Sequence, residues 1–261
     1  MSTVSPEPLS VRSIVYFAYI GDESTPDEIA RGRAAYMESQ LQWLSGLIRV
    51  AGGRFRVIVP YVAPRRWDAV MHDLVGRYGF QVDPASIAAE RVNSFEYRGF
   101  CALKALALAS DPDHMIYYCH SKGITQLSPS KMGLFRFHTA IGLKADLDPL
   151  ITGPNLSRAT LFPSKFGWCF YNFFWIKSGY MAGLTVIPSA DRYSFEALVG
   201  DPLDREGYRG VQALIDQVPA SETGLVAKPW YRASETSSPE LAATYGRYAR
   251  MPLPGSDMSV S

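Results

Sequence analysis

Residues 13–20 read SIVYFAYI, a run composed almost entirely of β-branched, aromatic and other apolar side chains. A short apolar run of this kind predicts a strand that is buried on both faces of a sheet. Thr25, Pro26 and Glu28 follow with the residue types of a helix start, with Thr25 as the cap and Glu28 in the capping-box position. Apolar residues at helical spacing then continue to the glycine pair at 52–53, where this helix is expected to end.

Strand and helix patterns alternate outward from this first pair. In the first half, strands are predicted at 54–62, within 80–92 and at 115–119, and helices at 67–78 and from a cap at 93–94 to 108. In the second half, helices are predicted at 132–143, 178–184, 195–200 and 210–218, and strands at 159–162 and 168–177, with 127–131 as a loop. The alternation over the first half implies right-handed βαβ units and a mostly parallel sheet.

The predicted fold class is α/β, with a Rossmann-like, mostly parallel central sheet flanked by helices and an irregular C-terminal tail. Residues 1–10 are expected to form a flexible N-terminus, and 11–218 a single domain with halves 11–125 and 126–218. Pro, Ser, Thr, Gly and Ala dominate 219–261, which predicts an irregular tail. Because ligands of open parallel sheets bind at the carboxyl ends of the strands, function is expected at 18–22, 61–65, 93–96 and 120–123.

Composition excludes several classes of protein. The 26 basic residues nearly balance the 25 acidic ones, so the net charge of +1 argues against a dedicated nucleic-acid binder. The three cysteines include no CxxC pair, which excludes a disulfide-rich scaffold and gives no zinc signature. The chain also lacks GxGxxG, phosphate-loop, GxSxG and HExxH motifs, an apolar run of membrane-spanning length and a signal-peptide pattern at its start. A cytoplasmic protein is therefore expected.

The sharpest local pattern is the His120-Ser-Lys122-Gly123 segment at the end of a predicted strand. Side chains alternate along a strand, so His120 and Lys122 are expected on one face, and Gly123 permits a tight turn. An imidazole and a lysine at this position could hold a diphosphate, with the lysine acting as a point charge. The alternative is a surface turn with a solvated lysine and a histidine that packs on an aromatic neighbour.

Three more residues have both a functional and a structural interpretation. Glu96, close after Asn93, either satisfies amides at a helix start or binds a hydroxyl of a ribose or base. Asn172, in an aromatic run with Trp175, either contacts a sugar or bonds to backbone within the core. Glu196 either acts as a general base or simply pairs with the arginine four residues before it.

In their order and spacing, three segments resemble GT-A type glycosyltransferases, most closely the polysaccharide-building branch related to rhamnan-synthesis enzymes. These segments are YYCHSKG at 117–123, NFFWIK at 172–177 and RYSFEALVG at 192–200, and the resemblance covers about 11–200. It implies a GT-A-like fold and transfer of a sugar from a nucleotide-diphosphate donor to a glycan or other hydroxyl acceptor in surface polysaccharide synthesis. A non-catalytic nucleotide-sugar or glycan-binding protein on the same fold, and a sugar-nucleotide phosphotransferase, are the alternatives.

The resemblance also implies residue roles. His120 and Lys122 would occupy the place of the Asp-x-Asp motif that binds a divalent metal in most such enzymes. No metal ligand is therefore assigned, although a divalent metal cofactor stays open. The implied roles are catalytic for Glu196 (the base), Lys122 and His120, donor-binding for Ala18, Tyr19, Asn93, Glu96 and Gly123, and sugar- or acceptor-binding for Asn172 and Trp175. Expected partners are the donor and the glycan acceptor, without nucleic acid and with peripheral association at the inner face of a membrane.

Overall fold

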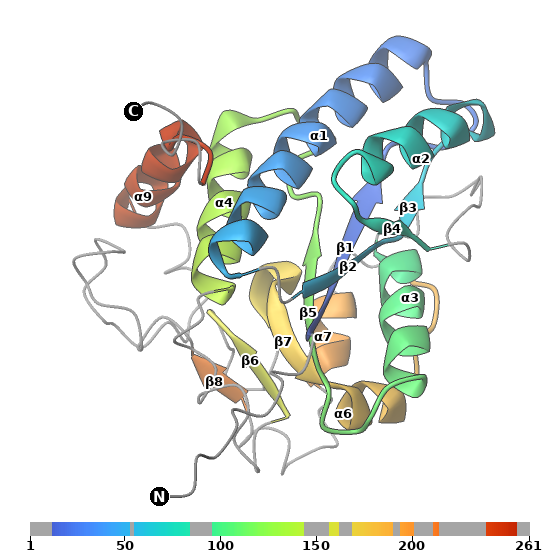
Figure 1. Ribbon diagram of the computed structural model, residues 1–261, viewed down its shortest axis with the longest axis vertical. Helices are drawn as coiled ribbons and strands as arrows, with labels where there is room; N and C mark the ends of the chain where they lie inside the picture. The colour runs from blue at the N-terminus through green and yellow to red at the C-terminus, as the bar shows by residue number, and fades with distance from the viewer. Residues whose placement is uncertain are drawn as a thin grey trace, which may run out of the picture.

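The computed structural model describes residues 12–52, 55–83, 96–143, 157–161, 169–189, 194–200, 211–213 and 239–254 (Figure 1). The strands are β1 (Arg12–Tyr19), β2 (Phe55–Val59), β3 (Tyr61–Val62), β4 (Gln81–Val82), β5 (Met115–His120), β6 (Arg158–Thr160), β7 (Phe174–Lys177) and β8 (Val211–Ala213). The helices are α1 (Asp27–Val50), α2 (Asp68–Gly76), α3 (Tyr97–Leu108), α4 (Pro129–Gly142), α6 (Ser178–Gly183), α7 (Ser194–Gly200) and α9 (Pro239–Arg250), with short 3-10 turns η1 (Arg65–Trp67) and η4 (Phe170–Asn172).

The strands form one mixed sheet in the order β4-β2-β1-β5-β7-β6-β8. Among the described strands, β7 alone runs against its neighbours, since it pairs antiparallel with both β5 and β6 while the other pairs are parallel. Pro60 separates β2 from β3, and both lie parallel to β1. The break follows from chemistry, because proline has no N–H for the ladder and only its carbonyl is used, by the amide of Ala18. The prediction of a mostly parallel α/β sheet is confirmed.

Both faces of the central strand β1 are buried, as its continuous apolar sequence predicts. Ile14, Tyr16 and Ala18 face one core, which α1, α2 and α4 cover. Val15 and Phe17 face a second core against α3, α6 and α7. Figure 1 shows these two helical layers on opposite sides of the sheet. This sandwich fixes the carboxyl ends of β1 and β5 relative to the helices around them.

The prediction of an irregular C-terminal tail is wrong for Pro239–Arg250. These residues form helix α9, which packs along α4 (Figure 1). The close approach depends on Gly133, where a Cβ would lie 1.8 Å from the carbonyl oxygen of Tyr245. One guanidinium nitrogen of Arg136 donates to carbonyls at the end of α9 and just after it, those of Tyr248, Ala249 and Met251. A helix that contains several Ala and Tyr residues therefore forms within a segment whose average composition is that of a loop.

Three local predictions are also corrected. Residues 211–213 form strand β8 where a helix was expected, because they pair with β6 at the sheet edge. The strand expected over 168–177 is shorter, since η4 interrupts it and β7 begins at Phe174. At the start of α1, no side chain caps the helix. Instead, the hydroxyl of Thr25 accepts a hydrogen bond from the amide of Asp22, at 3.0 Å, and stabilises the preceding turn.

Some expectations fall on residues that the structure does not describe: the N-terminus at 1–10, Asn93, and the tail outside 239–254. No helix in the described ranges combines the length and apolar character needed to cross a membrane. Peripheral membrane association stays a prediction.

Candidate functional site

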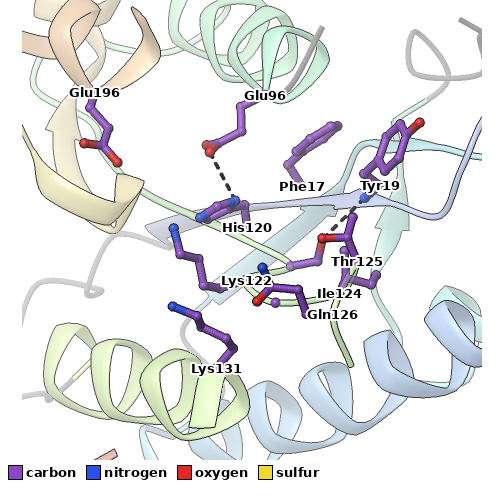
Figure 2. Close-up of a pocket in the computed structure, with 12 residues that line it drawn as sticks. Phe17, Tyr19, Glu96, His120, Lys122, Ile124, Thr125, Gln126, Lys131 and Glu196 are labelled. Atoms are coloured by element: carbon purple, nitrogen blue, oxygen red, sulfur yellow. Dashed lines mark hydrogen bonds and ion pairs between the residues drawn. The ribbon is translucent and has the colours of Figure 1, made fainter. Parts of the chain in front are cut away.

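A pocket with a volume of about 280 Å³ opens at the carboxyl ends of β1 and β5. The chain continues from β1 to β2 on one side and later adds β5 on the other side, so this edge is the point where the strand order reverses. Open parallel sheets bind ligands at such points. The pocket is lined by Phe17 and Tyr19 from β1, by residues 120–126 at the end of β5 and in the turn after it, by Glu96 before α3, by Lys131 of α4 and by Glu196 of α7 (Figure 2).

The turn after β5 has a defined backbone structure. The amide of Ser121 donates to the carbonyl of Phe17 at 2.7 Å, and the hydroxyl of Ser121 accepts from the amide of Tyr19 at 3.3 Å. Gly123 then takes a φ of +80°, which favours glycine, and a Cβ there would lie 2.2 Å from Cβ of Lys131. Two features therefore require a glycine at position 123: its positive φ angle and its close contact with α4.

Helix α1 supports the same turn from behind. The carbonyl of Lys122 accepts hydrogen bonds from the side-chain amide of Gln40 at 3.2 Å and from the hydroxyl of Tyr36 at 3.3 Å. Gln40 is fully buried, and its side-chain oxygen accepts from the hydroxyl of Tyr16 at 2.7 Å. Buried polar groups of this kind are costly to leave without partners. The backbone that carries Lys122 is thus anchored through Gln40 to the central strand.

His120 and Glu96 form a pair at the back of the pocket. Nδ1 of His120 lies 3.2 Å from Oε1 of Glu96, and Nε2 lies 3.1 Å from the carbonyl oxygen of Tyr171. A carbonyl only accepts, so Nε2 carries a hydrogen. The contact between Nδ1 and Oε1 then requires one further proton, held by either partner. Figure 2 shows the pair between α3 and the end of β5.

Glu96 has an unusual environment for a carboxyl group. Burial raises the pKa of Glu96 from 4.5 to about 7, opposed by the nearby charge of Lys122 and by hydrogen bonds from Asn172 and Tyr118, while the charge of Glu196 raises it further. The hydroxyl of Tyr118 donates to Oε2 of Glu96 at 3.2 Å. A carboxyl group with a pKa near neutrality can exchange its proton under physiological conditions.

Tyr171 connects the site residues through a strained backbone. Tyr171 and Asn172 have φ values of 66° and 53°, in the left-handed region that non-glycine residues seldom adopt. The amide of Tyr171 donates to Oε1 of Glu196 at 3.3 Å, and its carbonyl accepts from His120. Nζ of Lys122 lies 5.1 Å from the centre of its ring. Such strain is costly and is concentrated at functional sites.

The pocket contains charged side chains of both signs. Figure 2 shows the ammonium groups of Lys122 and Lys131 directed toward the same side of the pocket, with the carboxylate of Glu196 reaching in from α7. An anion with more than one charge can lie against the lysines, and a hydroxyl group can approach the carboxylate. The arrangement suits chemistry in which negative charge develops on one group while another loses a proton.

The structure brings six of the predicted residues to this pocket: Tyr19, Glu96, His120, Lys122, Gly123 and Glu196. Ala18 is fully buried on the opposite face of β1 from the pocket residues Phe17 and Tyr19. Trp175 is not brought to the pocket, because it is buried in the core and its indole N–H donates to the carbonyl of Gly142 at 2.6 Å. Trp175 pairs with Tyr117 of β5 and with Ala159 of β6, so its side chain is held within the sheet and away from the pocket at the carboxyl end of β5.

Asn172 occupies an intermediate position. It is 1% exposed and does not line the pocket, but its side chain hydrogen-bonds to Glu96. Its Oδ1 atom has no hydrogen-bond partner within the described part of the chain. Asn172 therefore supports the site through Glu96.

Lys131 is the site residue that the sequence patterns did not single out, because 127–131 read as a loop. The available signal was Ser128-Pro129, since proline is favoured at the first position of a helix, and α4 indeed begins at Pro129. A helix start at that position places Lys131 in the first turn of α4.

The side chains do not suit a divalent metal. Across the described ranges, no three His, Cys, Asp or Glu side chains gather as metal ligands. Glu96 and His120 bind each other, and the remaining charges near them include two ammonium groups, which repel a cation.

Neither a protein family, a curated protein nor a solved structure matches this chain. The function is therefore inferred from the geometry of the pocket and from the sequence segments that form it.

Proposed function

We propose that the protein is a glycosyltransferase that transfers a sugar from a nucleotide-diphosphate donor to a hydroxyl group of a glycan in surface polysaccharide synthesis. The observation that carries the proposal is the pocket at the β1–β5 edge, into which Lys122, Lys131 and Glu196 extend from three different elements: the turn after β5, α4 and α7. The segments at 117–123, 172–177 and 192–200 that resemble GT-A enzymes supply His120, Lys122 and Glu196 to this pocket, and Asn172 to its support.

In the proposed reaction, the acceptor oxygen attacks the anomeric carbon and forms the new glycosidic bond. The bond between that carbon and the phosphate oxygen breaks, and its electron pair leaves with the nucleoside diphosphate. Lys122 stabilises the negative charge that develops on the leaving phosphate. Glu196 accepts the proton of the acceptor hydroxyl. Attack from the side opposite the leaving group inverts the configuration at the anomeric carbon.

His120 and Glu96 have a positioning role in this proposal. Both ring nitrogens of His120 already have partners, Glu96 and the carbonyl of Tyr171. The pair holds Tyr171 in its strained conformation, and the amide of Tyr171 orients Glu196. His120 therefore acts on the base through Tyr171.

Binding is the first test. Purified protein is titrated by calorimetry with UDP, GDP, dTDP, CDP and ADP, and Lys122→Met is compared with Lys177→Met. Lys177 is the matched control, because it pairs with the exposed Asp113 at the opposite end of the sheet. The proposal predicts binding of at least one diphosphate, weakened about 10- to 100-fold in Lys122→Met and unchanged in Lys177→Met. Absence of binding to every nucleotide would contradict the proposal.

The products distinguish glycosyl transfer from the two alternatives. Incubation with the corresponding sugar nucleotide, with water or added glycan as the acceptor, is followed by ³¹P NMR. Release of nucleoside diphosphate that Glu196→Gln slows about 100-fold or more supports glycosyl transfer with Glu196 as the base. Release of nucleoside monophosphate would indicate phosphotransfer, and binding without turnover in the presence of glycan acceptors would indicate a binding protein.

A further inference from the structure

Lys131 lies in the first turn of α4, directly against the turn that carries Lys122. The contact is close, because a Cβ on Gly123 would lie 2.2 Å from Cβ of Lys131. Both lysines line the pocket, and Figure 2 shows their ammonium groups directed toward the same side of it. Two positive charges thus enter one cavity from two elements that the fold holds together.

This placement does not favour the stability of α4. The first turn of a helix prefers acidic residues, yet the first turn of α4 contains none and carries Lys131 instead. No carboxylate in the described ranges forms an ion pair with Lys131. Like charges near each other also repel. A multivalent anion in the pocket would offset both the unfavourable position of Lys131 at the start of α4 and the repulsion between the two ammonium groups.

We propose that Lys131 and Lys122 bind the two phosphates of a nucleoside diphosphate, one ammonium group to each, and that Lys131 makes the site select diphosphates over monophosphates. The inference rests on the proposed function, because it assumes that the pocket holds the nucleotide part of the donor. It adds a binding residue that the sequence resemblance does not include. It also gives a physical reason why the donor of the proposed reaction would be a sugar carried on a diphosphate and not on a single phosphate.

The matched variants separate charge from packing. Lys131→Met keeps the apolar stem that packs against Gly123 but removes the ammonium group. Lys131→Arg keeps a positive charge at the same position. If Lys131 only fills space beside the turn, Lys131→Met binds nucleotides as the wild type does.

The experiment compares the dissociation constants of the nucleoside diphosphate and monophosphate of the same base, by calorimetry at low and moderate salt. The proposal predicts that Lys131→Met weakens diphosphate binding about 10- to 100-fold and monophosphate binding much less, so that the preference for diphosphate collapses. Lys131→Arg should restore most of that preference, and the salt dependence of diphosphate binding should be smaller in Lys131→Met.

The outcomes also separate this inference from the proposed function. If the wild type binds diphosphates and Lys131→Met keeps the same preference over monophosphates, the role of Lys131 is wrong while the proposed function stands. If the wild type binds no nucleotide, both are overturned. Circular dichroism of each variant checks that the overall helix content is unchanged before the constants are compared.

Discussion

Glu96→Gln tests the electrostatics of the pocket without any ligand. Burial raises the pKa of Glu96 from 4.5 to about 7, so the folded protein binds this proton more tightly than the unfolded chain. Stability from this group is therefore fully present below about pH 4.5 and is lost as the pH rises through 7. At 1.36 kcal/mol per pKa unit, the loss between pH 5 and 8 is about 2–3 kcal/mol.

Glutamine resembles the protonated carboxyl group, since it can accept from Tyr118 and donate to Nδ1 of His120. Glu96→Gln removes the titration, so its unfolding free energy should fall about 2–3 kcal/mol less than that of the wild type between pH 5 and 8. Urea unfolding at several pH values measures this difference. Glu28→Gln is the control, because Glu28 is exposed in the first turn of α1 and its curve should stay parallel to that of the wild type. If the unfolding free energies of the wild type and of Glu96→Gln change in parallel with pH, the reasoning is refuted.

Four further predictions follow from the same contacts. Gly123→Ala should lower the unfolding free energy by about 2–4 kcal/mol in urea, because it adds a Cβ at a φ of +80° against Lys131. Gln40→Met should lower it by about 1–3 kcal/mol, because it leaves the hydroxyl of Tyr16 without its acceptor and removes one of the two hydrogen bonds to the carbonyl of Lys122. Calorimetry should show diphosphate affinity falling as the pH rises through 7, since an ionised Glu96 repels phosphate. EDTA should change that affinity little, because ammonium groups supply the positive charge.

The central fold was predictable from local patterns. The unbroken apolar run of β1 indicates a strand between two helical layers, and both of its faces are indeed buried. Ligands of open parallel sheets bind at the carboxyl ends of the strands, and this rule depends only on the direction and order of the strands. It therefore predicted the location of the pocket. The reversal of β7 and the position of β8 were not predictable, since they depend on pairing between residues far apart in the sequence.

The candidate site was predictable only where a motif follows a strand. His120 is the last residue of β5, and Lys122 and Gly123 follow within three residues, so their common location is fixed by the strand end. Trp175 was expected at the sugar because it is aromatic, but its position in the middle of the sheet buries it. Lys131 reaches the pocket only because α4 packs against the turn at Gly123, a tertiary contact that no local pattern shows.

A crystal structure of the protein with the nucleoside diphosphate selected by titration tests the central claim most directly. The account predicts phosphate oxygens within hydrogen-bond distance of the ammonium groups of Lys122 and Lys131, with the terminal phosphate on the side that Glu196 faces. A nucleotide bound anywhere other than between the carboxyl ends of β1 and β5, or with its phosphates turned away from both lysines, would contradict it.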